Sequence, residues 1–176
     1  GDPGTGWYRI GAVQNGGLAL EPTLAMLGSS LDEAHAALAE GVSGDDPVFV
    51  PYLAGERTPF MDPQIRGSWT GISLGTTREM LLRSALEGVA HSVDLGIQAV
   101  SDAGGDLPET LPFIGGGSTN LVFAQLLADC ANRPLAHIDV PDAAVRGAAL
   151  LATGQTSYPV PIQASTTTFP DDSRTG

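Results

Sequence analysis

Apolar runs of strand length alternate along the chain with segments whose apolar residues recur at helical spacing. The longest predicted helix begins at a capping box of Thr76 and Glu79 and carries an apolar residue at every third or fourth position. That apolar face comprises Leu82, Leu86, Val89, Val93, Ile97 and Val100. The alternation of strands and helices predicts an α/β domain in which helices pack on a sheet.

Glycine and proline residues separate the predicted elements. Strands are expected at residues 7–13, 48–53, 68–73, 111–114 and 135–139. Helices are expected at residues 18–27, 30–40, 76–100, 120–131 and 142–153, with Ser30, Thr76 and Asp142 as N-caps. Residues 155–176 are rich in Thr, Ser and Pro and show no periodicity, so we expect a tail or linker behind one domain at residues 1–154.

The charge of the chain excludes several classes of function. Twenty acidic and eight basic residues give a net charge of −12, and every basic residue is an arginine. Without lysine, the chain has neither the phosphate-binding loop that needs a lysine nor a lysine for Schiff-base chemistry. An acidic chain also repels a polyphosphate backbone, so nucleic-acid binding is not expected.

Cysteine content and hydropathy bear on where the protein works. The single cysteine, Cys130, has no partner for an internal disulfide, which favours a reducing cytoplasm. No apolar run approaches the roughly 18 residues that cross a bilayer, so no membrane partner is expected. The sequence begins at Gly1 rather than Met, and we expect it to be part of a longer polypeptide.

The strongest local feature is a predicted strand that runs into Gly115, Gly116 and Gly117 and then into a helix near Asn120. Glycines at such a junction let a flat ligand or a phosphate approach the backbone, and the helix N-terminus presents free N–H groups. A tight strand-to-helix turn that binds nothing explains the same residues equally well. The motif is not the dinucleotide-binding GxGxxG, because Asn120 occupies the position of its last glycine.

Two further groups of polar residues allow more than one interpretation. Residues 54–67 hold Glu56, Arg57, Asp62 and Arg66, which we interpret as an Arg–carboxylate network that fixes a long loop. The long helix places three polar residues on one face at helical spacing. A metal site is one interpretation of this face, and a solvated polar face is the simpler one. These three are Glu87, His91 and Asp94.

Five segments taken together resemble the C-terminal domain of the FGGY carbohydrate kinases. In chain order they are GAVQNGG at residues 11–17, PYLAGERTP at 51–59, RSALEGVA at 83–90, IGGGS at 114–118 and GAALLA at 147–152. The resemblance covers residues 7–154. The sequence of the GERTP loop is most similar to that of xylulose kinases, with gluconate-type kinases next. It implies an actin-like, ribonuclease-H-like fold that forms one lobe of a two-domain sugar kinase.

The resemblance also implies ligands, partners and residues. ATP with Mg²⁺ and a small sugar, D-xylulose first, would be the ligands, and a preceding N-terminal kinase domain would supply the catalytic base and most sugar contacts. Gly17 and Glu21 match family residues near the nucleotide, and Gly115, Gly116, Gly117 and Asn120 match the adenosine-binding turn. We therefore expect this chain alone to have no catalytic activity. Self-association into a homodimer is left as an open alternative. The alternative is a stand-alone, non-catalytic actin-like nucleotide-binding or interaction module.

Overall fold

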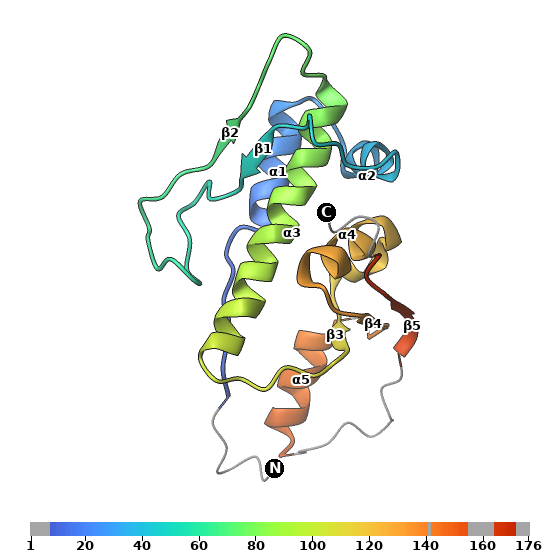
Figure 1. The fold of residues 1–176 in the computed structure, drawn as a ribbon. Helices are drawn as coiled ribbons and strands as arrows, with labels where there is room; N and C mark the ends of the chain where they lie inside the picture. Colours follow the sequence, from blue (N-terminus) through green and yellow to red (C-terminus); the bar gives the residue numbers. More distant parts are fainter. Residues whose placement is uncertain (1–7, 141, 155–163, 172–176) are drawn as a thin grey trace.

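The computed structural model describes residues 8–140, 142–154 and 164–171. Its centre is the 25-residue helix α3, against which α1, α2, α4 and β1 pack (Figure 1). The five α-helices of the described part are α1 (Gly17–Met26), α2 (Leu31–Ala39), α3 (Arg78–Asp102), α4 (Leu121–Ala131) and α5 (Ala143–Ala152). No helix in the described ranges combines the length and the apolar composition that a membrane crossing requires.

The strands form two small sheets. β1 (Val48–Val50) pairs antiparallel with β2 (Ser68–Thr70), next to the N-terminal half of α3. The second sheet has the order β3-β4-β5, in which β3 (Leu111–Phe113) is parallel to β4 (Leu135–Ile138) and β5 (Ala164–Thr168) is antiparallel to β4. A short 3-10 helix, η1 (Gly116–Thr119), leads from β3 into α4, which is the crossover to β4. The predicted α/β class is therefore confirmed.

The apolar face predicted for the long helix forms the core of the molecule. Leu82, Leu86 and Val89 of α3 are at most 2 % exposed and pack against α1, α2 and α4. Phe123 and Leu127 of α4 complete the same cluster from the side of the second sheet. Burial of a full aliphatic side chain stabilises a fold by about 1.5–3 kcal/mol, so this stripe decides where α3 lies.

The predicted helix caps were confirmed at Ser30 and shifted by one residue at α3. Ser30 accepts a hydrogen bond from the Glu33 backbone N–H, and the Glu33 carboxylate accepts one from the Ser30 N–H, which confirms that capping box. At α3 the cap is Thr77 and not Thr76. The Thr76 hydroxyl instead accepts a hydrogen bond from the Ser73 backbone N–H and closes the preceding turn, so two adjacent threonines divide the two roles.

Three predicted elements differ in the structure. Residues 8–13 form no strand, and within them Ala12 bonds through its N–H to the Thr58 hydroxyl and through its carbonyl to the Thr58 N–H rather than to a neighbouring strand. Asp142 precedes α5 with a left-handed backbone (φ 53°) and makes no capping hydrogen bond. Residues 155–176 are not wholly without regular structure, since β5 lies among them and completes the second sheet. The strand expected to begin at Trp7 also includes a residue outside the described ranges.

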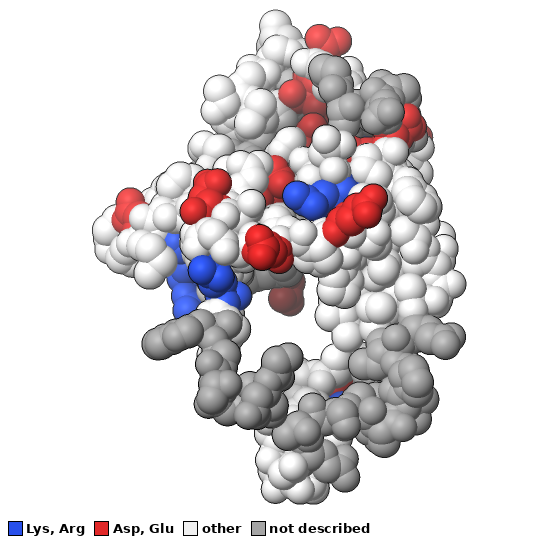
Figure 2. Space-filling view, turned by 60° about the horizontal axis from the view of Figure 1, so that its bottom comes forward, with Lys and Arg blue, Asp and Glu red and all other residues white. Residues whose placement is uncertain are grey.

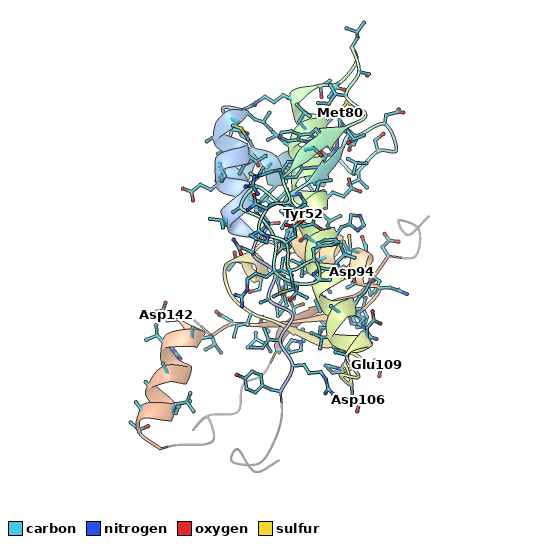
Figure 3. The ribbon with its side chains drawn as sticks, turned by 90° about the vertical axis from the view of Figure 1, so that its left-hand side faces the viewer. Tyr52, Met80, Asp94, Asp106, Glu109 and Asp142 are labelled. Carbon is cyan, nitrogen blue, oxygen red and sulfur yellow. The ribbon has the colours of Figure 1, made fainter. Side chains whose placement is uncertain are left out.

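Helix α5 stands away from the packed helices (Figure 3). None of its described residues is buried, and Val145 and Leu151 are 69 % and 80 % exposed. The helix nevertheless carries the periodic apolar residues that predicted it from the sequence. Its apolar side chains are thus exposed to solvent in this structure.

The loop at residues 54–67 is fixed by one buried carboxylate rather than by its arginines. Glu56 is 3 % exposed, and its oxygens accept hydrogen bonds from the backbone N–H groups of Gln14 and Arg57, both at 2.7 Å, and from the Asn15 side-chain amide at 2.9 Å. Arg66 donates to the carbonyls of its own loop. The Arg57 side chain is exposed and has no hydrogen bond or ion pair within the described residues, so the expected Arg–carboxylate network is wrong.

A buried ion pair joins the connection before β1 to α3. The Arg83 guanidinium donates two hydrogen bonds to the Asp46 carboxylate, at 2.7 and 2.8 Å. The Asp46 side chain is 1 % exposed and that of Arg83 is 12 % exposed. Planar bidentate pairing of this kind fixes orientation as well as distance.

Replacement of Asp46 by Asn should lower the free energy of unfolding by about 2–3 kcal/mol, because one charged acceptor oxygen becomes an N–H donor that faces the guanidinium. Chemical denaturation monitored by circular dichroism measures the loss. The matched control is Asp45→Asn at the exposed neighbouring position, which should leave stability unchanged. Equal effects of the two substitutions would contradict a structural role for the pair.

Glu56→Gln should lower the free energy of unfolding by about 1–3 kcal/mol, since the new amide would place its own donor opposite a donor of the 14–15 segment. Arg57→Lys serves as the control and should leave the melting temperature unchanged, because the side chain has no partner in the described part of the chain. A destabilised Arg57→Lys protein with an intact Glu56→Gln protein would reverse this assignment.

Candidate functional site

The three glycines after β3 have different roles. Gly115 has a φ of +99°, a conformation that residues with a Cβ rarely adopt. A Cβ at Gly116 would meet nothing within 4 Å, whereas a Cβ at Gly117 would meet Phe113 and Phe123 at 3.5 and 3.7 Å. Gly115 therefore makes the turn, Gly116 leaves open space beside it, and Gly117 faces the core.

Hydroxyl groups close the turn on itself. The Ser118 Oγ donates to the Gly115 carbonyl at 2.7 Å, and the Thr119 Oγ1 donates to the Gly116 carbonyl at 2.8 Å. The carbonyl groups of the turn are thus satisfied by hydroxyl groups of the same turn. On the side where a Cβ of Gly115 or Gly116 would project, no other atom lies within 4 Å of it.

Asn120 is the N-cap of α4. Its Oδ1 accepts hydrogen bonds from the backbone N–H groups of Val122 and Phe123, each at 3.0 Å. An amide oxygen has two lone pairs, so this oxygen is fully used by the helix. The side-chain NH₂ remains as the group that Asn120 can offer to a ligand.

A hollow of about 670 Å³ lies beside the glycine turn. It is bounded by the turn, the end of β4, the start of α5 and the first half of β5. Two carboxylates line it, and no arginine does so among the described residues. The lining residues are Gly115, Gly116, Ser118, Thr119, Leu121, His137, Ile138, Asp139, Val140, Asp142, Ser165 and Thr166.

The hollow has the chemistry of a site for a neutral, polar ligand. Carboxylates and carbonyls accept hydrogen bonds from hydroxyl or amino groups, but they repel phosphate. An uncharged ligand with hydrogen-bond donors suits this lining better than a triphosphate does. Of the lining residues, the sequence singles out the glycines, and it indicates Asp142 only as an N-cap.

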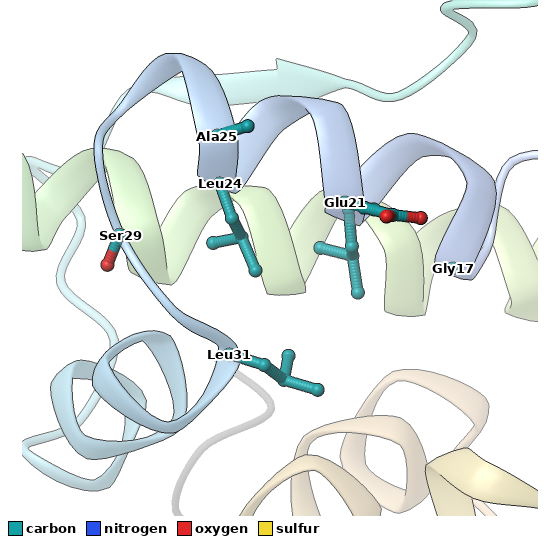
Figure 4. Close-up of a pocket in the computed structure, with 7 residues that line it drawn as sticks. Gly17, Glu21, Leu24, Ala25, Ser29 and Leu31 are labelled. Atoms are coloured by element: carbon teal, nitrogen blue, oxygen red, sulfur yellow. The ribbon is translucent and has the colours of Figure 1, made fainter.

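Gly17 and Glu21 line a second hollow of about 450 Å³. It is mostly apolar, and Figure 4 shows Leu24 of α1 and Leu31 at the start of α2 directed into it, with Glu21 nearer the N-terminal end of α1. This hollow shares no lining residue with the one beside the glycine turn. Gly17 and Glu21 thus line a different depression from Gly115 and Gly116, and neither Gly117 nor Asn120 lines either hollow.

The polar face of α3 is neither a metal site nor fully solvated. Asp94 is 9 % exposed, and burial raises the pKa of its carboxyl, as burial also does for the pKa of Glu87. Burial beside these carboxylates raises the pKa of the Cys130 thiol to about 12, so this cysteine is not a reactive thiolate. Within the described ranges no group of three His, Cys, Asp or Glu side chains is arranged to hold a metal ion.

Sequence reasoning missed the residues that β4 and β5 contribute to the site. His137 follows buried Leu135 by two residues on β4 and therefore lies on the same face of the strand. Its side chain is accordingly buried, at 4 % exposed. Ser165 and Thr166 come from β5, which was not predicted. The alternation on β4 was the only available signal, and it indicated burial rather than function.

Acidic and basic side chains both occur on the face of the molecule that Figure 2 shows. Figure 2 shows carboxylates on several separate parts of one face, with arginine side chains among them. One of the surface contacts links α3 to α1 and α2, where Arg78 donates to the Leu27 and Gly28 carbonyls and pairs with Glu33.

Comparisons with known proteins agree with the resemblance found in the sequence. A xylulose kinase of Staphylococcus epidermidis is 36 % identical over 66 % of this chain and 23 % of its own, and a glycerol kinase of Nitrosomonas eutropha is 35 % identical over 68 % and 24 %. The crystal structure of a xyloylose kinase from Brucella ovis superposes with a TM-score of 0.75 at 30 % identity, over 90 % of this chain and 34 % of that one.

The chain therefore spans about a quarter of the length of these curated relatives and about a third of that structure. The structural likeness confirms the expected actin-like fold of a sugar-kinase lobe. The model of the C-terminal domain of the FGGY family matches residues 10–155, which is most of the chain. The chain belongs to the FGGY family of carbohydrate kinases, as a C-terminal domain.

Proposed function

We propose that this chain is the nucleotide-binding lobe of a carbohydrate kinase that transfers the γ-phosphoryl group of ATP to a ketose. The observation that carries the proposal is the open space above Gly115 and Gly116, at the edge of a hollow lined by hydrogen-bond acceptors. A nucleoside can lie against the backbone there without meeting a side chain. Carboxylates such as Asp139 and Asp142 are suitable acceptors for ribose hydroxyl groups.

The phosphates of ATP would extend away from this hollow. Phosphoryl transfer depends on positioning and on neutralisation of phosphate charge, and the described residues gather neither arginines at the hollow nor a carboxylate cluster for Mg²⁺. The residues of this chain fit adenosine but do not by themselves fit Mg²⁺. We therefore propose that the metal, the catalytic base and most sugar contacts belong to residues outside this chain, and that the chain alone shows no turnover.

D-xylulose is the sugar that we propose. Support comes from the GERTP loop at residues 55–59 and from the xylulose kinase among the relatives. The glycerol kinase relative, at nearly the same identity, makes glycerol the first competitor to test. Buried Glu56 ties this loop to the segment that leads into α1, and no residue of the loop lines the hollow beside the glycine turn.

A coupled assay of ADP formation by the intact protein tests this function against a panel of ketoses, aldoses, polyols and gluconate. The expected result is the highest kcat/KM with D-xylulose. A higher value with glycerol or gluconate would retain the kinase and replace the sugar. ATP binding without turnover of any member of the panel would favour a non-catalytic nucleotide-binding module instead.

Gly116→Val in the intact protein should raise the KM for ATP at least about tenfold, because the branched side chain would occupy the space proposed for adenosine. Its melting temperature should change little, since the position is open and its φ is not positive. Gly117→Ala is the matched control and should leave the KM for ATP unchanged, because its new methyl group would face Phe113 and Phe123. An unchanged KM in a folded Gly116→Val protein would remove this turn from the site.

A further inference from the structure

His137 lies where the glycine turn, β4 and β5 meet. It is 4 % exposed, and both of its ring nitrogens have partners from other elements. The Nδ1 atom is 2.9 Å from the Ser118 carbonyl oxygen, and the Nε2 atom is 2.8 Å from the Thr168 Oγ1. The ring also meets Phe113 of β3 edge to face, with centroids 5.8 Å apart.

These partners assign the protons of the imidazole. A carbonyl oxygen only accepts, so Nδ1 carries the proton and donates it to Ser118. In the neutral ring Nε2 is then an acceptor, and the Thr168 hydroxyl donates to it. Both nitrogens are satisfied in a single tautomer, which fixes the ring plane relative to the turn and to β5.

The bond to Ser118 has no equivalent elsewhere in the turn. The hydroxyls of Ser118 and Thr119 bond back to Gly115 and Gly116 and hold the turn together internally. Among the described residues, His137 supplies the side-chain hydrogen bond that attaches η1 to the sheet. The position of Gly116 relative to the rest of the hollow therefore depends on this ring.

β5 is part of the same arrangement. Its Ser165 and Thr166 line the hollow, and the Ser165 Oγ donates to the His137 carbonyl at 3.2 Å. Beyond β5, the Gln125 side-chain amide of α4 donates to the Phe169 carbonyl at 2.8 Å. The strand lies outside residues 10–155, which the family model matches, yet it forms one wall of the hollow.

We propose that His137 is a positioning residue for adenine-nucleotide binding: it holds the glycine turn at the distance from β5 that a nucleoside requires, with Thr168 fixing the ring. The proposal rests on the proposed nucleotide site. It assigns a role to β4 and β5 that the glycine motif alone does not indicate. The ring has no contact with the reacting phosphates in this proposal, so its effect is on nucleotide affinity.

Three substitutions in the intact protein separate the two hydrogen bonds. His137→Phe removes both while it keeps a ring, His137→Asn keeps an N–H donor near the Nδ1 position, and Thr168→Val removes only the second bond. His137→Phe should raise the KM for ATP about threefold to tenfold, the range for loss of one or two neutral hydrogen bonds. His137→Asn should restore most of the affinity, Thr168→Val should give a smaller loss, and kcat and the KM for the sugar should stay unchanged.

Exposed His91 on α3 provides the matched control, and His91→Phe should change neither KM. Titration calorimetry with MgATP gives a binding constant that does not depend on turnover. An unchanged KM for ATP in folded His137→Phe, or an equal rise of the KM values for ATP and sugar, would overturn the proposal. If His137→Phe does not fold, an ATP affinity in Thr168→Val equal to that of the unaltered protein overturns it as well. Failure of the unaltered protein to bind ATP would refute the nucleotide site itself.

Discussion

Gly88 and Gly96 leave two gaps along α3 into which other parts of the chain pack. A Cβ at Gly88 would overlap the Phe49 carbonyl of β1, and one at Gly96 would lie 2.5 Å from Val13 Cγ2. Gly11 makes the reciprocal contact, because its own Cβ would lie 2.5 Å from the Gly96 carbonyl oxygen. Any side chain at these positions would push β1 or the segment before α1 away from the helix, and the site elements attached to them would move as well.

Two buried carboxylates hold in place the segments that the glycines of α3 allow to pack closely. Glu56 bonds to the backbone and side-chain N–H groups of residues 14–15, which lead directly into α1. Asp46 bonds to Arg83 and fixes the connection before β1. A buried carboxylate that lost its donors would be costly, so each of these groups strongly favours one register of its loop over a shifted one. Glu56 thereby fixes the segment just before α1, the helix from which Gly17 and Glu21 line the second hollow.

Local signals predicted the helices better than the strands. Helical periodicity and the capping box of Ser30 and Glu33 depend only on residues that are close in the sequence, so both could be interpreted from the sequence alone. Whether residues 8–13 pair as a strand depends instead on what lies beside them, and here that neighbour is a loop whose Thr58 hydroxyl and backbone take the bonds. β5 was missed for the converse reason, because its alternation of Thr and Ser carries no apolar pattern and its pairing with β4 depends on distant residues.

The chemistry of the candidate site was predictable only in part, since it arises from three segments brought together by the fold. The glycine turn is a local motif, but the acceptors Asp139 and Asp142 and the β5 wall reach it only through the β3–β4–β5 pairing. That pairing also makes the proposed nucleotide site compatible with a chain of net charge −12. In the proposed arrangement the acceptors face the uncharged nucleoside, where negative charge favours bound hydroxyl and amino groups, and the triphosphate lies away from them. A lobe without lysine is consistent with this division, because neutralisation of the phosphates is then required of groups on the other side of the bound nucleotide.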